Sequence, residues 1–138
     1  MGHIITLKKS EFMQTTERIK RTKTTTTIDS SKNICTIINV FTVDPKKTGE
    51  LFELLKEATE QIMSRQPGYI SANLHISHEK KHLTNYAQWE TMDDFMNMVR
   101  NPEVQSHMKK AEALCSDIKP VTYSKIWSHS NRDEKNFS

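Results

Sequence analysis

The fold is decided by the stretch from Pro67 to Glu90, which reads PGYISANLHIS, then HEKKH, then LTNYAQWE. Apolar and polar residues alternate over 70–76 and again over 83–89. A period of two is typical of a strand with one buried face, and the Pro-Gly pair is typical of the turn before it. The two runs therefore predict an antiparallel hairpin with HEKKH at its tip. The expected buried face of the first strand holds Ile70, Ala72, Leu74 and Ile76.

The second strand of this hairpin carries two polar groups on its apolar face. Leu83, Asn85, Ala87 and Trp89 fall on one side, so that an amide and an indole lie four residues apart. At ~3.3 Å per residue, their polar tips lie along a line about 13 Å long. A flat ligand fits along such a line, which makes Asn85 and Trp89 candidate site residues.

The segment NICTIINVFTV, residues 33–43, predicts a strand that is covered on both faces. Its apolar residues occupy both alternations, and Asn39 interrupts one of them. An unpaired buried amide costs about 1–3 kcal/mol. Asn39 therefore needs a partner or a purpose, and it joins the candidate site.

A long amphipathic helix is expected after this strand. Asp44 is expected to cap it, Pro45 to occupy its first position, and Gln66 to be its last residue before Pro67. Its apolar residues recur at three- and four-residue spacing, as in a helix that rests on a sheet.

The chain beyond the hairpin predicts further helix and a final strand. Thr91 or Asp93 is expected to cap a helix, and Asn101-Pro102 to start another turn whose apolar stripe continues to Cys115. The last strand is expected over 120–128, with Val121, Tyr123 and Trp127 on one face and Ile126 on the other. His107 lies near the edge of the helical stripe, one position before an apolar residue.

The element order is strand, helix, strand, strand, helix, strand. With right-handed crossovers this order predicts an α+β domain of ferredoxin-like βαββαβ topology, a four-stranded antiparallel sheet with helices on one face. Helices on one face leave the other face of the sheet uncovered, although the first strand is apolar on both sides. A second copy of the sheet is the simplest cover, so a homodimer is expected.

Composition divides the chain into residues 1–32, a polar basic extension; 33–129, the domain; and 130–138, a tail. The extension carries seven Lys and Arg against three acidic residues, a net charge of +4, whereas the rest of the chain is near −1. A short helix over 11–21 and β-prone residues 24–28 are its only structural signals. A basic extension on a nearly neutral domain argues against a nucleic-acid interface.

Other function classes find little support in the sequence. No apolar run is long enough for a membrane helix and no signal-peptide pattern is present, so a cytoplasmic location is expected without membrane association. Cys35 and Cys115 sit in apolar patterns, as small buried hydrophobes do. His75, His78 and His82 surround the hairpin tip, but neighbouring strand positions point to opposite faces, which disfavours a metal site.

Four phrases, INVFTVDP, RQPGYISANLHIS, NYAQW and NPEVQSHMKKA, resemble the antibiotic biosynthesis monooxygenase domain of the dimeric α/β-barrel superfamily. The resemblance covers about residues 33–128. It implies a ferredoxin-like fold and homodimers whose sheets pack into a shared barrel. It also implies a monooxygenase that uses molecular oxygen on a small aromatic substrate.

Two branches of that family bear on this chain. Cofactor-free oxygenases convert a polycyclic anthrone or phenol to a quinone, with an Asn and a Trp on the third strand facing the substrate; Asn85 and Trp89 match them. A Tyr early in the next helix assists in some members, and this sequence has Phe95 near that place. Haem-degrading members use a first-strand Asn, the same Trp and a helix His that binds iron, which implies Asn39, Trp89 and His107.

The resulting candidate catalytic residues are Asn39, Asn85, Trp89 and His107, with His107 as the cofactor ligand only if haem binds. The amides and the indole N–H are fixed donors suited to an anionic substrate in a dry pocket. His107 is the side chain whose pKa suits a base at neutral pH. The preferred hypothesis is a monooxygenase with no cofactor, and the alternatives are a haem-degrading monooxygenase and a non-catalytic dimeric binding module.

Overall fold

The computed structural model describes residues 23–132. The expected helix over 11–21 and the end of the tail lie outside this range. The elements are, in chain order, β1 (Cys35–Val43), α2 (Thr48–Gln61), η1 (Met63–Arg65), β2 (Tyr69–Ile76), β3 (His82–Trp89), α3 (Met92–Val99), α4 (Pro102–Leu114) and β4 (Cys115–Tyr123). The strands form one antiparallel sheet of order β2-β3-β1-β4, which confirms the predicted ferredoxin-like topology.

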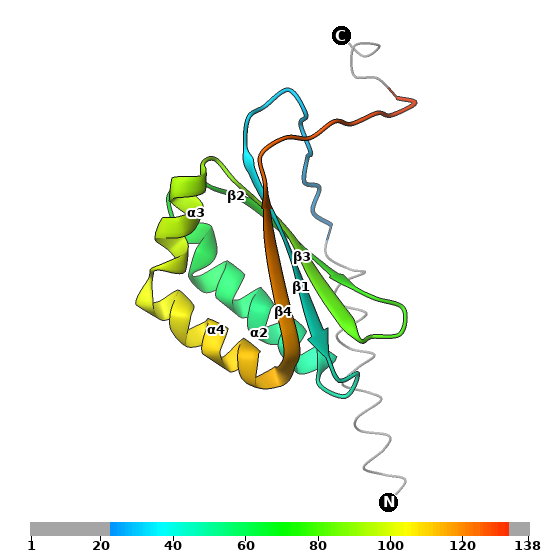
Figure 1. Cartoon of the computed structure of the whole chain (residues 1–138), viewed down its shortest axis with the longest axis vertical. Helices are drawn as coiled ribbons and strands as arrows, with labels where there is room; N and C mark the ends of the chain where they lie inside the picture. The colour runs from blue at the N-terminus through cyan, green and yellow to red at the C-terminus, as the bar shows by residue number, and fades with distance from the viewer. Residues whose placement is uncertain (1–22, 133–138) are drawn as a thin grey trace, which may run out of the picture.

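The three helices all lie on one side of the sheet (Figure 1). Two groups of buried side chains fill the space between the layers. One surrounds Trp89 and includes Ile37 and Met98, and the other surrounds Leu51 and Leu83. Met108 of α4 packs against both groups, so this helix spans the length of the core.

The Pro67-Gly68 turn produces a departure from the predicted alternation in β2. The register against β3 shifts between Tyr69 and Ser71, which is the pattern of a β-bulge. Tyr69 therefore pairs with Trp89 and packs into the core, whereas Ile70 is 40% exposed. The prediction that Ile70 is buried was wrong, because one extra residue shifts the alternation by one position.

Helix α2 is shorter than predicted at both ends. Asp44 caps a turn before the helix instead of the helix itself: its Oδ1 accepts from the Lys46 N–H at 2.9 Å and its carbonyl from the Lys47 N–H at 2.8 Å. The helix begins at Thr48 and ends at Gln61, and the η1 turn leads on to Gln66.

The predicted helix caps after the hairpin are confirmed. The Thr91 hydroxyl accepts from the Asp94 N–H at 3.0 Å, and the Asn101 side chain accepts from the Glu103 N–H at 2.9 Å. Pro102 opens α4, as its fixed φ favours.

The last strand begins five residues earlier than predicted, at Cys115, and ends at Tyr123. The expectation that Cys115 continues a helical stripe was wrong, since α4 ends at Leu114 and passes straight into the strand. Trp127 lies beyond the strand and is 83% exposed, so it does not belong to the core. Pro120, where the strand was expected to begin, lies in its interior opposite Asn39.

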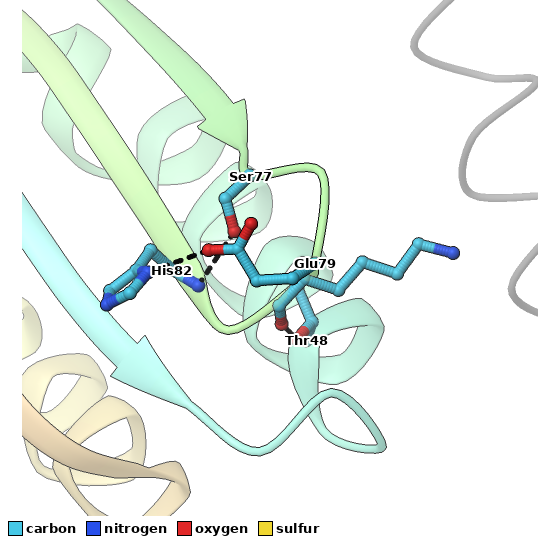
Figure 2. Close-up of polar contacts among 5 residues, drawn as sticks. Thr48, Ser77, Glu79 and His82 are labelled. Carbon is cyan, nitrogen blue, oxygen red and sulfur yellow. Dashed lines mark hydrogen bonds and ion pairs between the residues drawn. The ribbon is translucent and has the colours of Figure 1, made fainter.

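The tip of the β2–β3 hairpin is tied to the start of α2. Figure 2 shows Thr48, Ser77, Glu79 and His82 gathered at this tip. The buried Thr48 hydroxyl donates to the Lys80 carbonyl at 2.6 Å, and Ser77 Oγ accepts from the His82 N–H at 3.1 Å. The Thr48 bond joins the hairpin tip to the start of α2, and the Ser77 bond closes the hairpin itself.

The residues before β1 run along the side of the sheet opposite the helices (Figure 1, blue). Residues 24–28 form no strand, but Thr26 Oγ1 donates to Asn73 Oδ1 at 2.6 Å and the Thr27 carbonyl accepts from Gln88 Nε2 at 3.0 Å. We call residues 23–28 the strap. The strap covers the outer surface of β2 and β3, and Gln88 beneath it is 1% exposed.

None of the helices within residues 23–132 is both long and apolar enough to cross a membrane.

Candidate active site

A cavity of about 590 Å³ lies between the sheet and the helices. Its floor comes from all four strands and its roof from α2, α3 and α4. Most of its lining side chains are apolar, and the polar ones on the floor include Asn39 and Asn85. No Lys, Arg or His of the described chain is among the lining residues. The arrangement suits an uncharged, largely apolar molecule held by a few polar groups.

Asn39 sits in the middle of the floor. It is directly opposite Asn85 in the β1–β3 register, so their side chains project from neighbouring positions on the same face. Its Oδ1 is buried and has no hydrogen-bond partner among the described residues. Because buried polar groups are nearly always paired, this orphaned oxygen indicates a place where a ligand supplies the missing partner.

The Asn85 side chain forms only some of its possible hydrogen bonds with the described chain. Its Oδ1 accepts from the Asn73 backbone N–H at 3.3 Å, which fixes how the amide is turned. No described residue accepts from its Nδ2. The amide is thus oriented by β2 and keeps a donor available on the cavity side.

Trp89 closes one end of the cavity. Its side chain is 2% exposed and meets Tyr69 edge-on, with ring centroids 5.6 Å apart and planes at 86°. Phe95 contacts it from α3 at 6.4 Å. The indole N–H donates to no residue of the described chain, although a buried indole usually finds an acceptor. It is a second donor open to a ligand.

His107 is placed differently from the other three candidates. It lies on α4 between the cavity-lining positions Val104 and Met108, and it is not itself among the lining residues. Its Nδ1 is buried and without a partner among the described residues. Its role as a base therefore stays a prediction.

The position of His107 outside the cavity lining also concerns the haem alternative. The haem alternative requires the ring of His107 to reach iron inside the cavity, and the neighbours of His107 line the cavity in its place. The residues that surround the cavity therefore do not fit the haem group in the predicted manner, and we derive no step through haem.

Several cavity residues were not predicted from the sequence. Tyr69 is the most important, because its ring lies in the cavity beside Trp89. Glu112 and Asp117 bring carboxylates to the lining near the start of β4. The helical spacing of Glu112 from Met108 was an available signal, whereas the bulge that turns Tyr69 inward left none in the alternation.

The histidines near the hairpin tip gather no metal-binding set. Within residues 23–132, no three His, Cys, Asp or Glu side chains lie close enough together to hold a metal ion. His82 instead lies 3.4 Å from Glu79, through Nδ1 and Oε1. The backbone N–H of Glu79 itself, and then the hydrogen bond from His82, hold the pKa of the Glu79 carboxyl below its usual range.

The sequence is similar to that of known proteins. The sequence profile described as antibiotic biosynthesis monooxygenase matches residues 34–110. The tetracenomycin-F1 monooxygenase of Streptomyces glaucescens is 37% identical over 95 residues, which cover 69% of this chain and 84% of that protein.

Two solved structures share the architecture. A monooxygenase of Streptomyces coelicolor, crystallised with nanaomycin D, superposes with a TM-score of 0.66 at 22% identity, over 72% of this chain and 93% of its own. SnoaB, a cofactor-independent oxygenase of Streptomyces nogalater, gives a TM-score of 0.59 at 22% identity, over 70% of this chain and 96% of its own. At this identity the likeness shows the fold alone. The profile match and the 37% identity show the family: the chain belongs to the antibiotic biosynthesis monooxygenase family.

Proposed function

We propose that this protein is a cofactor-independent monooxygenase that oxidises a polycyclic aromatic or quinol-type small molecule with molecular oxygen. One observation carries the proposal. An apolar cavity is lined by polar atoms of Asn39, Asn85 and Trp89 that have no partner in the described chain. The tetracenomycin-F1 monooxygenase relative supports the reaction type, since its name states the monooxygenation of a small molecule.

The reaction needs no added electron source if the substrate supplies the electrons. Loss of a proton from an anthrone C–H or a phenol O–H gives a delocalised anion, which passes an electron to oxygen. The substrate radical and superoxide combine to a peroxide anion at carbon, which takes back the proton lost in the first step to become a hydroperoxide, and loss of water leaves a quinone carbonyl. One oxygen atom enters the product, the other leaves as water, and the methylene carbon is oxidised.

The protein's task in this scheme is to stabilise the substrate anion where water is excluded. The Asn85 Nδ2 donor and the indole N–H are open on the cavity side and are held in place by the strand register. Fixed donors in a dry site contribute more than mobile water does, because no reorganisation is needed as charge develops. The Asn39 Oδ1 is an acceptor suited to a substrate hydroxyl.

Oxygen consumption with dithranol, a hydroxylated anthrone, tests this function. The purified protein, treated with a chelator and free of flavin, is expected to consume oxygen and form the quinone. Asn85→Ala and Trp89→Phe are each expected to lower kcat/KM by about tenfold or more. Asn97→Ala is the control, because Asn97 is an exposed amide of α3 that does not line the cavity, and the activity of this variant is expected to change by less than about twofold.

The proposal fails if wild-type protein does not oxidise dithranol or related anthrones, or if the cavity variants lose less than tenfold. A protein that binds the quinone without consuming oxygen would instead be a binding module. Activity that appears only with added haem would identify the haem alternative.

We also propose that the active form is a homodimer. The outer surface of β4 leaves Val121 46% and Tyr123 45% exposed, and Val121 lies opposite Ile38 of β1 in the strand register. These apolar side chains suit a second copy of the sheet. Light scattering coupled to gel filtration at micromolar concentration is expected to give twice the chain mass, and a monomer would contradict this part of the proposal.

A further inference from the structure

We propose that Tyr69 contacts the substrate and that its phenol donates a hydrogen bond to a substrate oxygen. The proposal rests on the proposed function and adds a residue to its site. Tyr69 is the first residue of β2, directly after the Pro67-Gly68 turn, and its ring contacts Trp89.

The backbone places Tyr69 in the cavity and holds it there. Gly68 has a φ of +83°, and a side chain on it would collide with Asp94 of α3. The Gly68 carbonyl also accepts from the Glu90 N–H at 2.8 Å. The turn is thereby fixed against both β3 and α3, and the bulge that follows it turns Tyr69 to the helix side of the sheet.

Tyr69, Trp89 and Phe95 form an aromatic corner at one end of the cavity. Trp89 makes an edge contact with each of the other two rings, with centroids 5.6 Å from Tyr69 and 6.4 Å from Phe95. All three line the cavity, and Phe95 carries no polar group. Tyr69 therefore provides the one phenol among the lining residues of the described chain.

The hydroxyl of Tyr69 is free to act as a donor. It donates to no residue of the described chain. Burial raises the pKa of this phenol, with the Ala72 backbone amide acting in the opposite direction. A raised pKa keeps the proton on the oxygen through neutral and mildly alkaline pH, so the group remains a donor while the substrate is an anion.

The cavity needs such a donor because it lacks cations. Charge that develops on a substrate oxygen or on the terminal oxygen of the hydroperoxide has no lysine, arginine or histidine among the described lining residues to face. The open donors near Trp89 are its own N–H, the Asn85 amide and the Tyr69 phenol. A phenol beside the indole extends this row of donors by one group.

The test compares Tyr69→Phe with Tyr86→Phe. Tyr69→Phe keeps the ring that packs on Trp89 and removes only the hydroxyl. Tyr86 lies on β3 next to Asn85 but points to the outer face, so its variant is the matched control. The probes are dithranol for oxygen consumption and its quinone, danthron, for binding by titration calorimetry without turnover.

Tyr69→Phe is expected to weaken danthron binding by about three- to tenfold and to lower kcat/KM for dithranol by about tenfold or more. Tyr86→Phe is expected to leave both values within about twofold. Equal thermal midpoints of the two variants would exclude misfolding as the cause.

Binding and turnover of Tyr69→Phe within twofold of wild type would overturn the proposal. If wild type binds danthron without oxidising dithranol, the proposed function fails, and the ratio of danthron affinities between wild type and Tyr69→Phe still decides the role of Tyr69. If wild type does neither, both proposals are overturned.

Discussion

Gln88 on the outer face of the sheet and Asn39 on the helix face differ in the hydrogen bonding of their amides. On the outer face, Gln88 Nε2 donates both to the Thr27 carbonyl at 3.0 Å and to Ser71 Oγ at 2.9 Å. On the helix face, Asn39 Oδ1 is buried with no partner in the described chain, beside a cavity of about 590 Å³. An amide that the chain pairs with itself stabilises the fold, whereas an amide that the chain leaves open is available to a ligand.

The largest expected difference in the free energy of unfolding is between variants of the two tryptophans, one at an inner and one at an outer position. Trp89→Ala removes a buried indole that contacts two other rings, and is expected to lower the free energy of unfolding by about 3–5 kcal/mol. Trp127→Ala removes an exposed indole and is expected to change it by less than about 0.5 kcal/mol. Urea unfolding of both variants measures the difference. Similar losses for both would mean that the inner face is not the packed one.

The next largest expected effect on stability comes from the Pro67-Gly68 turn, which determines the face of the sheet that Tyr69 occupies. Gly68→Ala places a Cβ against Asp94 at a φ of +83°, and is expected to cost about 1–3 kcal/mol of stability. Thermal unfolding measures this loss. A variant as stable as wild type would show that the turn does not hold the positive φ, and would remove the basis for the inward position of Tyr69.

On the outer face, Gln88→Leu is expected to lower the free energy of unfolding by about 1–3 kcal/mol. The substitution keeps the volume and leaves Ser71 and the Thr27 carbonyl without their donor. Activity toward dithranol is expected to stay within about twofold of wild type, because the side chain points away from the cavity. Denaturant unfolding and oxygen consumption, measured together, check both parts.

On the inner face, Asn39→Leu is expected to change the free energy of unfolding in the opposite direction and by the smallest amount. Replacing an amide whose oxygen is buried and unpaired by an apolar side chain is expected to raise the free energy of unfolding by about 1 kcal/mol. Activity is expected to fall, since the acceptor for the substrate is lost. A stability loss as large as that of Gln88→Leu would show that Asn39 is paired within the fold.

The sequence was enough to predict the topology, because alternation and helical spacing report which face of each element is buried. It also identified Asn39, Asn85 and Trp89 as polar groups on apolar faces, and all three line the cavity. The inward position of Tyr69 was not predictable from alternation, since a single bulged residue reverses the assignment of faces.

The ends of helices and strands were harder to predict, because local sequence signals compete there. Asp44-Pro45 favours a helix start, but here it forms the turn before α2. Cys115 fits the spacing of the preceding helix, but its backbone pairs with Val43 in the sheet. At Cys115 the pairing with β1 decides between two locally acceptable structures, whereas at Asp44 the deciding contacts are local, since its side chain and carbonyl close the turn.

A crystal structure of the protein with bound danthron shows which face of the sheet receives the ligand. We expect the ring system to lie between the sheet and the helices, with its oxygens within hydrogen-bond distance of the Asn85 amide, the Trp89 indole and the Tyr69 hydroxyl. Danthron bound on the strap side of the sheet, or an Asn39 side chain that turns to pair with its own backbone while the cavity stays closed to the ligand, would contradict it.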